Sequence, residues 1–318
     1  LGFPKGQLVN YMVKHRRKQV PAWNIPGALR LREVLAQGRK LTLDDVEVGH
    51  DDVAYLQYTG GTTGVSKGAV LTHRNMIANV LQGRAWFTQG LVPDSNYVIA
   101  LPLYHIFSLT GNCWLFMTVG ARGIMIPNPR SIPEFIKTMQ QYPPTFFMGV
   151  NTLFNSLLNS AGFDKIDHSR LKCTIGGGMA VQAVVAERWQ AATGCVLSQG
   201  WGLTETSPIA TVTRLDAEKF TGTIGLPVPS TEISIRDDDG IALAINAVGE
   251  ICVRGPQVMR GYYNRADETA KVMLPDGWLR TGDIGRMDDA GYVYIEDRKK
   301  DMILRESCLS CGLRCTHS

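Results

Sequence analysis

Long apolar runs are missing from this sequence of 318 residues. No stretch approaches the roughly 20 uninterrupted apolar residues that a membrane-spanning helix needs, and no signal-peptide pattern follows Leu1. The formal net charge is only +4, and the concentrated basic face of a typical nucleic-acid-binding protein is lacking. These absences predict a cytoplasmic protein without a nucleic-acid partner, whose contact with a membrane would be peripheral, at its inner face.

Cysteine is sparse over most of the chain. Four cysteines are scattered among apolar neighbours, as small buried hydrophobic residues would be: Cys113, Cys173, Cys195 and Cys252. Three more crowd near the end: Cys308, Cys311 and Cys315. Cys-x-x-Cys can begin a metal site, but a fourth ligand at a convincing spacing is absent, and His317 qualifies only by proximity. A reducing compartment fits the scattered four.

Short β-rich runs alternate with helical patterns between residues 53 and 215. The candidate strands are Val53–Tyr58, Tyr97–Leu101, Gly123–Ile126, Thr145–Gly149, Leu171–Ile175 and Val196–Gln199. The candidate helices between them are Arg74–Phe87, Ile132–Gln141, Thr152–Asn159 and Val181–Ala192. This alternation predicts βαβ units and a doubly wound, mainly parallel sheet in an α/β fold, with ligands beyond the carboxyl ends of the strands.

After about Phe220 the pattern changes to strand-like alternation with glycine and aspartate turns. The predicted strands are Thr231–Arg236, Glu250–Arg254 and Tyr292–Glu296, so residues 216–297 predict a smaller antiparallel β subdomain. Residues 1–52 are harder to interpret. Their basic run Lys14–Lys18 is either a solvated helix face or a contact for anionic lipid or CoA.

The strongest single signal is a loop rich in glycine and threonine after the strand that ends at Tyr58. Its residues are Thr59, Gly60, Gly61, Thr62, Thr63, Gly64, Val65, Ser66, Lys67 and Gly68. Glycines let successive N–H groups point into one concavity, hydroxyls add donors, and Lys67 adds a full charge, as a polyphosphate requires. The P-loop NTPase motif is excluded because Ser66 precedes Lys67. A glycine-rich surface loop is the alternative.

This loop, with Ala69–Asn75 after it, resembles the phosphate-binding signature of the adenylate-forming superfamily, which includes acyl-CoA synthetases. Other motifs agree in order and rough spacing: Gly176–Met179, Gly200–Thr206, Gly277–Asp283 and Asp297–Asp301. The second has Trp201 where the family more often has tyrosine. The resemblance runs from near residue 1 to about Leu304, and several phrases are similar to bacterial long-chain fatty-acid–CoA ligases. This resemblance implies that the chain corresponds to the large domain of the family and that the domain is incomplete at both ends.

The resemblance implies a role for each motif in joining a carboxylate to AMP, with release of pyrophosphate. The residues from Thr59 to Gly68 would embrace the outer phosphates of ATP, and Lys67 would neutralise the departing pyrophosphate. Thr204 would bond the α-phosphate, and Glu205 would ligate Mg²⁺. His105 would lie beside the carboxylate and the α-phosphate, although a lone histidine among apolar residues is often only packed.

Adenine and ribose would be held by the remaining motifs. Trp201 and Gly202 would flank adenine, with close approach allowed by Gly176, Gly177, Gly178 and Met179, although Trp201 could also be a core aromatic. Asp283 would accept hydrogen bonds from both ribose hydroxyls, and Arg298 would approach the same ribose. Lys300 would mark the hinge, residues 298–304, about which a C-terminal domain rotates.

The substrates implied are ATP, a fatty acid and CoA, with Mg²⁺. Apolar stretches such as Ile106–Val119 and Phe146–Leu158 could wall an alkyl tunnel, although core packing explains them equally well. Residues 305–318 depart from the family and resemble a divergent or out-of-frame ending, so we expect no C-terminal domain and an incomplete reaction cycle. A non-catalytic nucleotide- or acyl-binding remnant and a fatty acyl-AMP ligase are the alternatives. Oligomeric state is left open.

Overall fold

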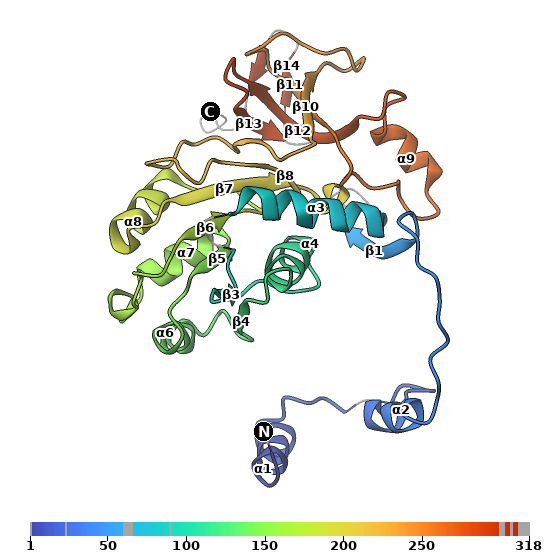
Figure 1. The fold of residues 1–318 in the computed structure, drawn as a ribbon, viewed down its shortest axis with the longest axis vertical. Coiled ribbons are helices and arrows are strands. Elements are labelled where there is room, and N and C mark those ends of the chain that lie inside the picture. The colour runs from blue at the N-terminus through green and yellow to red at the C-terminus, as the bar shows by residue number, and fades with distance from the viewer. Residues whose placement is uncertain are drawn as a thin grey trace. The chain divides into compact units, whose positions relative to one another are not determined.

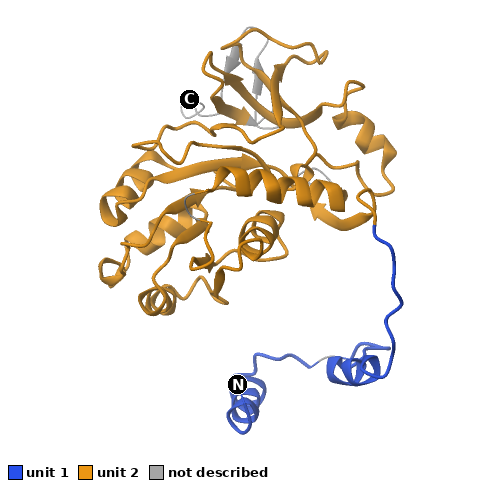
Figure 2. Ribbon diagram, viewed as in Figure 1, with its two compact units in different colours: residues 1–48 blue, residues 49–318 orange. Residues whose placement is uncertain are grey.

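The computed structural model describes residues 2–22, 24–59, 66–88, 91–298, 303–305 and 308–310. The chain divides into two compact units, residues 1–48 and residues 49–318, coloured separately in Figure 2. Three short helices of the first unit contain no buried residue: α1 (Lys5–Tyr11), η1 (Met12–Arg16) and α2 (Leu31–Gly38). The basic run Lys14–Lys18 is exposed, which fits either interpretation given above.

A seven-stranded sheet forms the centre of the second unit, in the order β4-β3-β5-β6-β7-β8-β9 (Figure 1). Strands β3 to β7 pair in parallel, whereas β8 and β9 continue the sheet antiparallel. The strands are β3 (Asn96–Ile99), β4 (Arg122–Met125), β5 (Phe146–Gly149), β6 (Cys173–Gly176), β7 (Leu197–Gly202), β8 (Ile209–Val212) and β9 (Leu226–Pro227). The predicted doubly wound, mainly parallel α/β sheet is therefore confirmed.

Both faces of this sheet are covered, because alternate residues of each strand point to opposite sides. On β5, Phe147 packs with Phe154 and Trp189 in one core, whereas Phe146 and Met148 pack in the other. The helices and helical turns of this part are α3 (His73–Trp86), α4 (Ile106–Leu109), η2 (Thr110–Trp114), α5 (Leu115–Met117), α6 (Ile132–Gln141), α7 (Asn151–Leu158), η3 (Phe163–Lys165), α8 (Ala183–Thr193) and η4 (Thr204–Thr206). Cys173, Cys195 and Cys252 are buried free thiols and Cys113 is partly buried.

The expected antiparallel β unit is a four-stranded sheet, in the order β10-β11-β12-β13. Its strands are β10 (Glu232–Arg236), β11 (Gly249–Arg254), β12 (Leu279–Met287) and β13 (Val293–Arg298), and helix α9 (Ala266–Val272) lies between β11 and β12 in the chain. β12 went unrecognised because its Gly282 and Asp283 interrupt the apolar alternation. The backbone of β14 (Ile303–Arg305) pairs with that of β15 (Cys308–Ser310).

One predicted strand lies elsewhere than expected. β1 (Val53–Thr59) pairs antiparallel with β2 (Lys67–Thr72) in a separate two-stranded sheet, outside the parallel one. The two strands are separated by residues 60–66, which are too few for the crossover that a parallel pair requires, so β1 and β2 pair antiparallel. Among the described residues, no helix is both long and apolar enough to cross a membrane.

Candidate active site

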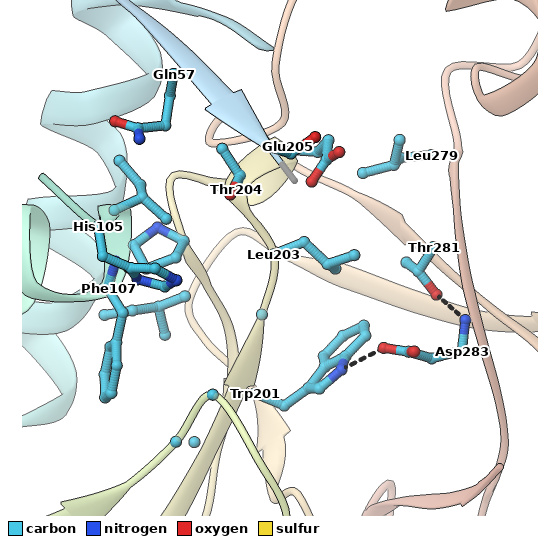
Figure 3. Close-up of a pocket in the computed structure, with 18 of the residues that line it drawn as sticks. Gln57, His105, Phe107, Trp201, Leu203, Thr204, Glu205, Leu279, Thr281 and Asp283 are labelled. Carbon is cyan, nitrogen blue, oxygen red and sulfur yellow. Dashed lines mark hydrogen bonds between the residues drawn. The ribbon is translucent and has the colours of Figure 1, made fainter. Parts of the chain in front are cut away.

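A cavity of about 730 Å³ lies at the carboxyl ends of the parallel strands. It is bounded by the ends of β5, β6 and β7, the hairpin β1–β2, the start of α4, and β12 of the smaller sheet (Figure 3). Because the loops of parallel strands converge at this edge, residues far apart in the sequence meet there. The predicted site residues that line it are Thr59, Lys67, His105, Gly177, Gly178, Trp201, Gly202, Thr204, Glu205 and Asp283.

Lys67 is the first residue of β2 and enters the cavity from the hairpin. The other edge of β2 is paired by the segment 260–263, since Val70 N–H donates to Gly261 O at 2.9 Å and Tyr263 N–H donates to Gly68 O at 2.8 Å. Lys67 Nζ lies 4.7 Å from the ring centroid of Tyr262 and 2.9 Å from Glu268 Oε2. The lysine is therefore held in place from two sides, by an aromatic face and by a carboxylate.

Glu205 lies in the short helix η4, which follows β7. Tyr262 donates its hydroxyl to Glu205 Oε1 at 2.7 Å, and the Met259 N–H donates to the Glu205 carbonyl at 2.8 Å. Burial, and then the neighbouring Glu205 carboxylate, raise the pKa of Tyr262, so the phenol stays protonated and acts as the donor. Tyr262 thus connects Glu205 to Lys67 within one polar network.

Asp283 is 4% exposed and faces the cavity from β12. The indole N–H of Trp201 donates to Asp283 Oδ2 at 2.9 Å, as Figure 3 shows. The irregular stretch of β12 before Asp283 is held by a second buried carboxylate: Glu250 Oε1 accepts from Gly282 N–H at 2.9 Å, and Glu250 Oε2 accepts from Arg280 at 3.2 Å. The aromatic ring and the carboxylate are therefore placed as a pair.

His105 caps the start of α4. Its Nδ1 accepts a hydrogen bond from Phe107 N–H at 3.2 Å, so Nε2 is the ring nitrogen that remains for a ligand. Gln57 on β1 donates to the Tyr104 carbonyl at 2.9 Å and so ties the hairpin to this loop. In Figure 3, Gln57, His105 and Phe107 lie on the side opposite Asp283.

Some predicted residues lie apart from the cavity or outside the described residues. Ser66, Gly68, Gly176 and Met179 are described but do not line it. A Cβ on Gly176 would overlap Val181, and one on Gly177 would lie 2.9 Å from Phe107, so these glycines make room for protein side chains. The backbone of Arg298 pairs opposite Asp283. Gly60, Gly61, Thr62, Thr63, Gly64 and Lys300 lie outside the described residues, as do Cys311, Cys315 and His317 of the candidate metal motif.

The sequence did not predict three residues that line the cavity, Tyr262, Glu250 and Lys271. It also did not predict Glu268, which binds Lys67. Local pattern offers little to find them, since Tyr262 reaches Glu205 across 57 residues and Glu268 reaches Lys67 across 201. A useful signal for Glu250 was an acid directly before the apolar run Ile251–Val253 in the strand Gly249–Arg254. In the described part of the chain, no cluster of three or more His, Cys, Asp or Glu side chains could hold a metal ion.

The family of AMP-binding enzymes matches residues 7–263. The matched range includes Lys67, Glu205 and Tyr262 of the cavity, whereas Asp283 lies beyond it. The chain belongs to the AMP-binding enzyme family. This confirms the family resemblance seen in the sequence, because the match covers most of the chain.

Relatives of this AMP-binding chain include long-chain-fatty-acid–CoA ligases. One from Yersinia pestis is 52% identical over 305 residues, covering 96% of this chain and 54% of the relative; one from Salmonella typhimurium is 50% identical with the same coverage. ATP-bound MatB from Rhodopseudomonas palustris aligns with a TM-score of 0.74 at 30% identity, covering 82% of this chain and 51% of that one. The chain thus spans about half the length of the curated relatives it matches.

Proposed function

We propose that this chain carries the adenylation site of a long-chain fatty-acid–CoA ligase, which uses ATP to activate a fatty acid as acyl-AMP, releases pyrophosphate and passes the acyl group to CoA. The observation that carries the proposal is the convergence of Lys67, the pair Thr204–Glu205, and the pair Trp201–Asp283 on one cavity. Its position at the carboxyl ends of parallel strands is where α/β folds bind nucleotides.

The nucleotide half of the site follows from charge and shape. Asp283 offers a carboxylate to the ribose hydroxyls, and the Trp201 ring, oriented by its bond to Asp283, offers a flat face to adenine. Lys67 supplies positive charge to the outer phosphates, and Thr204 a hydroxyl to the α-phosphate. His105 lines the cavity, and its Nε2 is the atom that would contact the reacting carboxylate or the α-phosphate. Positive charge at the leaving pyrophosphate favours the in-line displacement.

Glu205 is our candidate ligand for Mg²⁺. Its carboxylate lines the cavity and is only partly buried, and Tyr262 bonds only one of its two oxygens among the contacts described above. A single protein carboxylate suits Mg²⁺, which commonly completes its shell with phosphate oxygens and water. The ion, when bound, would neutralise charge on the phosphates.

Replacing Glu205 by glutamine tests this assignment. We expect E205Q to weaken binding of ATP with Mg²⁺ by about 10-fold and to leave AMP affinity within twofold, because AMP lacks the outer phosphates that share the ion. Isothermal titration calorimetry with and without EDTA gives both affinities. Glu187→Gln, on an exposed part of α8, is the matched control. Equal Mg²⁺ dependence in E205Q and wild type would exclude Glu205 as a ligand.

The acid half of the site is apolar. Five buried apolar side chains line the cavity: Phe87, Met148, Ile175, Ile209 and Val212. Such a lining favours the binding of a hydrocarbon chain, in proportion to the apolar area that binding removes from water. With the names of the relatives at about 50% identity, this lining supports a long-chain fatty acid as the substrate.

Chain length can be measured by binding alone, with non-reactive acyl-sulfamoyl-adenosines that carry C4 to C16 chains. We expect affinity for this chain to rise at least 100-fold from C4 to C12, about 2.7 kcal/mol, well below the ~0.8 kcal/mol per methylene available on full burial. Sulfamoyl-adenosine without an acyl group is the control for the nucleotide half. Preference for C4 would reject the long-chain assignment while leaving adenylation intact.

The proposal that the acyl group passes to CoA rests on the relatives' names. Comparing product formation with and without CoA separates a ligase from an enzyme that stops at acyl-AMP.

We place the activity in the cytoplasm, with peripheral contact to the membrane that supplies its lipid substrate. The free thiols of Cys173 and Cys195 support a reducing compartment.

A further inference from the structure

Helix α9 contributes a second lysine to the cavity. Lys67 and Lys271 both line it, although they are distant in the sequence. The two ammonium groups bind opposite oxygens of one carboxylate: Lys67 Nζ lies 2.9 Å from Glu268 Oε2, and Lys271 Nζ lies 2.6 Å from Glu268 Oε1. Glu268 itself is not among the lining residues of the cavity. One anion therefore balances two cations that face the same space.

The negative charge of Glu268 is fixed near neutral pH. Hydrogen bonds from Lys271 and then from Lys67 lower the pKa of Glu268 to about 2, so the carboxylate stays ionised near neutral pH and protonation does not release the lysines. Arg265 also approaches Glu268 Oε1, at 3.4 Å, but mainly pairs with Asp267 and does not line the cavity. Exchange of the lysines therefore depends on water or on a competing anion, and not on protonation of Glu268.

The two pairs that lysines form with Glu268 differ in how readily they exchange. The Lys271 side chain is 66% exposed, whereas those of Lys67 and Glu268 are 23% and 18% exposed. An exposed ion pair is weak, because water screens it and a long side chain loses entropy in it. A polyphosphate with several negative charges outcompetes a single carboxylate for such a lysine. Lys271 can thus leave Glu268 at little cost and bond an anion in the cavity.

We propose that Lys271 is a second phosphate-binding cation of this cavity, and that Glu268 is the counter-ion which the outer phosphates of a nucleoside triphosphate replace. The ligand class is a polyphosphate, bound by Lys67 and Lys271 together. The inference deepens the proposed function and rests on it for the nucleotide, whereas the polyphosphate site stands on the two lysines alone.

The first test is Lys271→Met, which keeps most of the unbranched side chain and removes its charge. Arg265→Met is the matched control, since it removes a charge from the same network outside the cavity. We expect K271M to weaken binding of inorganic tripolyphosphate 5- to 10-fold and R265M less than twofold, measured by isothermal titration calorimetry on the whole chain. Equal effects of the two variants would mean that only general charge matters, and would overturn the proposal.

Glu268→Gln tests the counter-ion. Because it frees both lysines, we expect E268Q to tighten tripolyphosphate binding about 3-fold, and the gain to shrink in the double variant with K271M. Weaker binding in E268Q would overturn the counter-ion role and indicate that Glu268 holds the lysines in place for the ligand. Thermal unfolding of each variant shows whether the fold is kept.

AMP separates this inference from the proposed function. It lacks the outer phosphates, so K271M and E268Q should bind AMP as wild type does, within twofold. Failure of the wild-type chain to bind AMP would overturn the proposed nucleotide site. In that case, weaker binding of tripolyphosphate by K271M would still support the polyphosphate site. Normal AMP binding with no effect of K271M on tripolyphosphate or ATP would overturn the inference alone.

Discussion

Replacing Asp283 by alanine is expected to weaken AMP binding about 100-fold. The change removes the carboxylate proposed to accept from the ribose hydroxyls, and hydrogen bonds to a charged group contribute about 1.5–3 kcal/mol each. It also removes the acceptor of the Trp201 indole N–H, so the ring loses its fixed orientation. Two such losses at the lower end of the range amount to about 3 kcal/mol, and each 1.4 kcal/mol is tenfold. Equilibrium dialysis or calorimetry gives the affinity.

Two comparisons make the Asp283 result specific to the ribose. Trp201→Phe keeps an aromatic face and removes only the N–H donor, so we expect a loss of about threefold. The ligand 2′-deoxy-AMP should bind about 10-fold more weakly than AMP to the wild type, and equally well to D283A, because the carboxylate that distinguishes them is gone. Undiminished discrimination in D283A would place the ribose elsewhere.

Gly202→Ala is expected to lower the free energy of unfolding by about 3 kcal/mol and to abolish AMP binding. A Cβ at this position would overlap the carbonyl of Pro208, at the irregular pairing where β7 meets β8. Overpacking against backbone cannot be relieved by a rotamer change, so the strand end that carries Trp201 must move. Urea unfolding followed by fluorescence measures the loss of stability.

Gly200 supplies the control for this effect from the same strand. Its nearest neighbour to an added Cβ is Ile175 Cγ2 at 3.4 Å, an ordinary contact, so Gly200→Ala should cost less than about 1 kcal/mol. If both variants unfold at the same urea concentration, the close approach of β7 and β8 is not what requires glycine at position 202.

Much of the fold followed from local pattern. Strands β3 to β7 and helices α3, α6, α7 and α8 fall on the predicted segments within a few residues, because buried parallel strands are short apolar runs separated by amphipathic helices. The error at β1 has a different origin. An apolar run predicts a strand but does not identify its partner, and β1 pairs antiparallel with the next strand in the chain, β2, and not with the parallel sheet.

The motif residues Lys67, Thr204, Glu205 and Asp283 were chosen in the sequence for their chemistry, and the fold brings all four to one cavity. Their individual roles stay predictions. What the sequence did not suggest is the network behind them, in which Tyr262 bonds Glu205 and Glu268 binds Lys67. Tyrosine and glutamate beside a surface helix have no distinctive local pattern, so their partners become apparent only from distances in space.

The sequence by itself determined the family and the kind of chemistry, because a phosphate loop, a Thr–Glu pair and a ribose carboxylate need particular residue types in a particular order. Only the tertiary structure decided which charges meet. Pairing of the segment 260–263 with the edge of β2 brings α9 to the cavity, and with it the ion pair of Lys67 with Glu268. The pair of Lys271 with Glu268 is local to α9, but the same placement of the helix sets Lys271 at the cavity. The physical reason is that electrostatic contacts depend on separation in space, which a strand pairing sets across about 200 residues of chain.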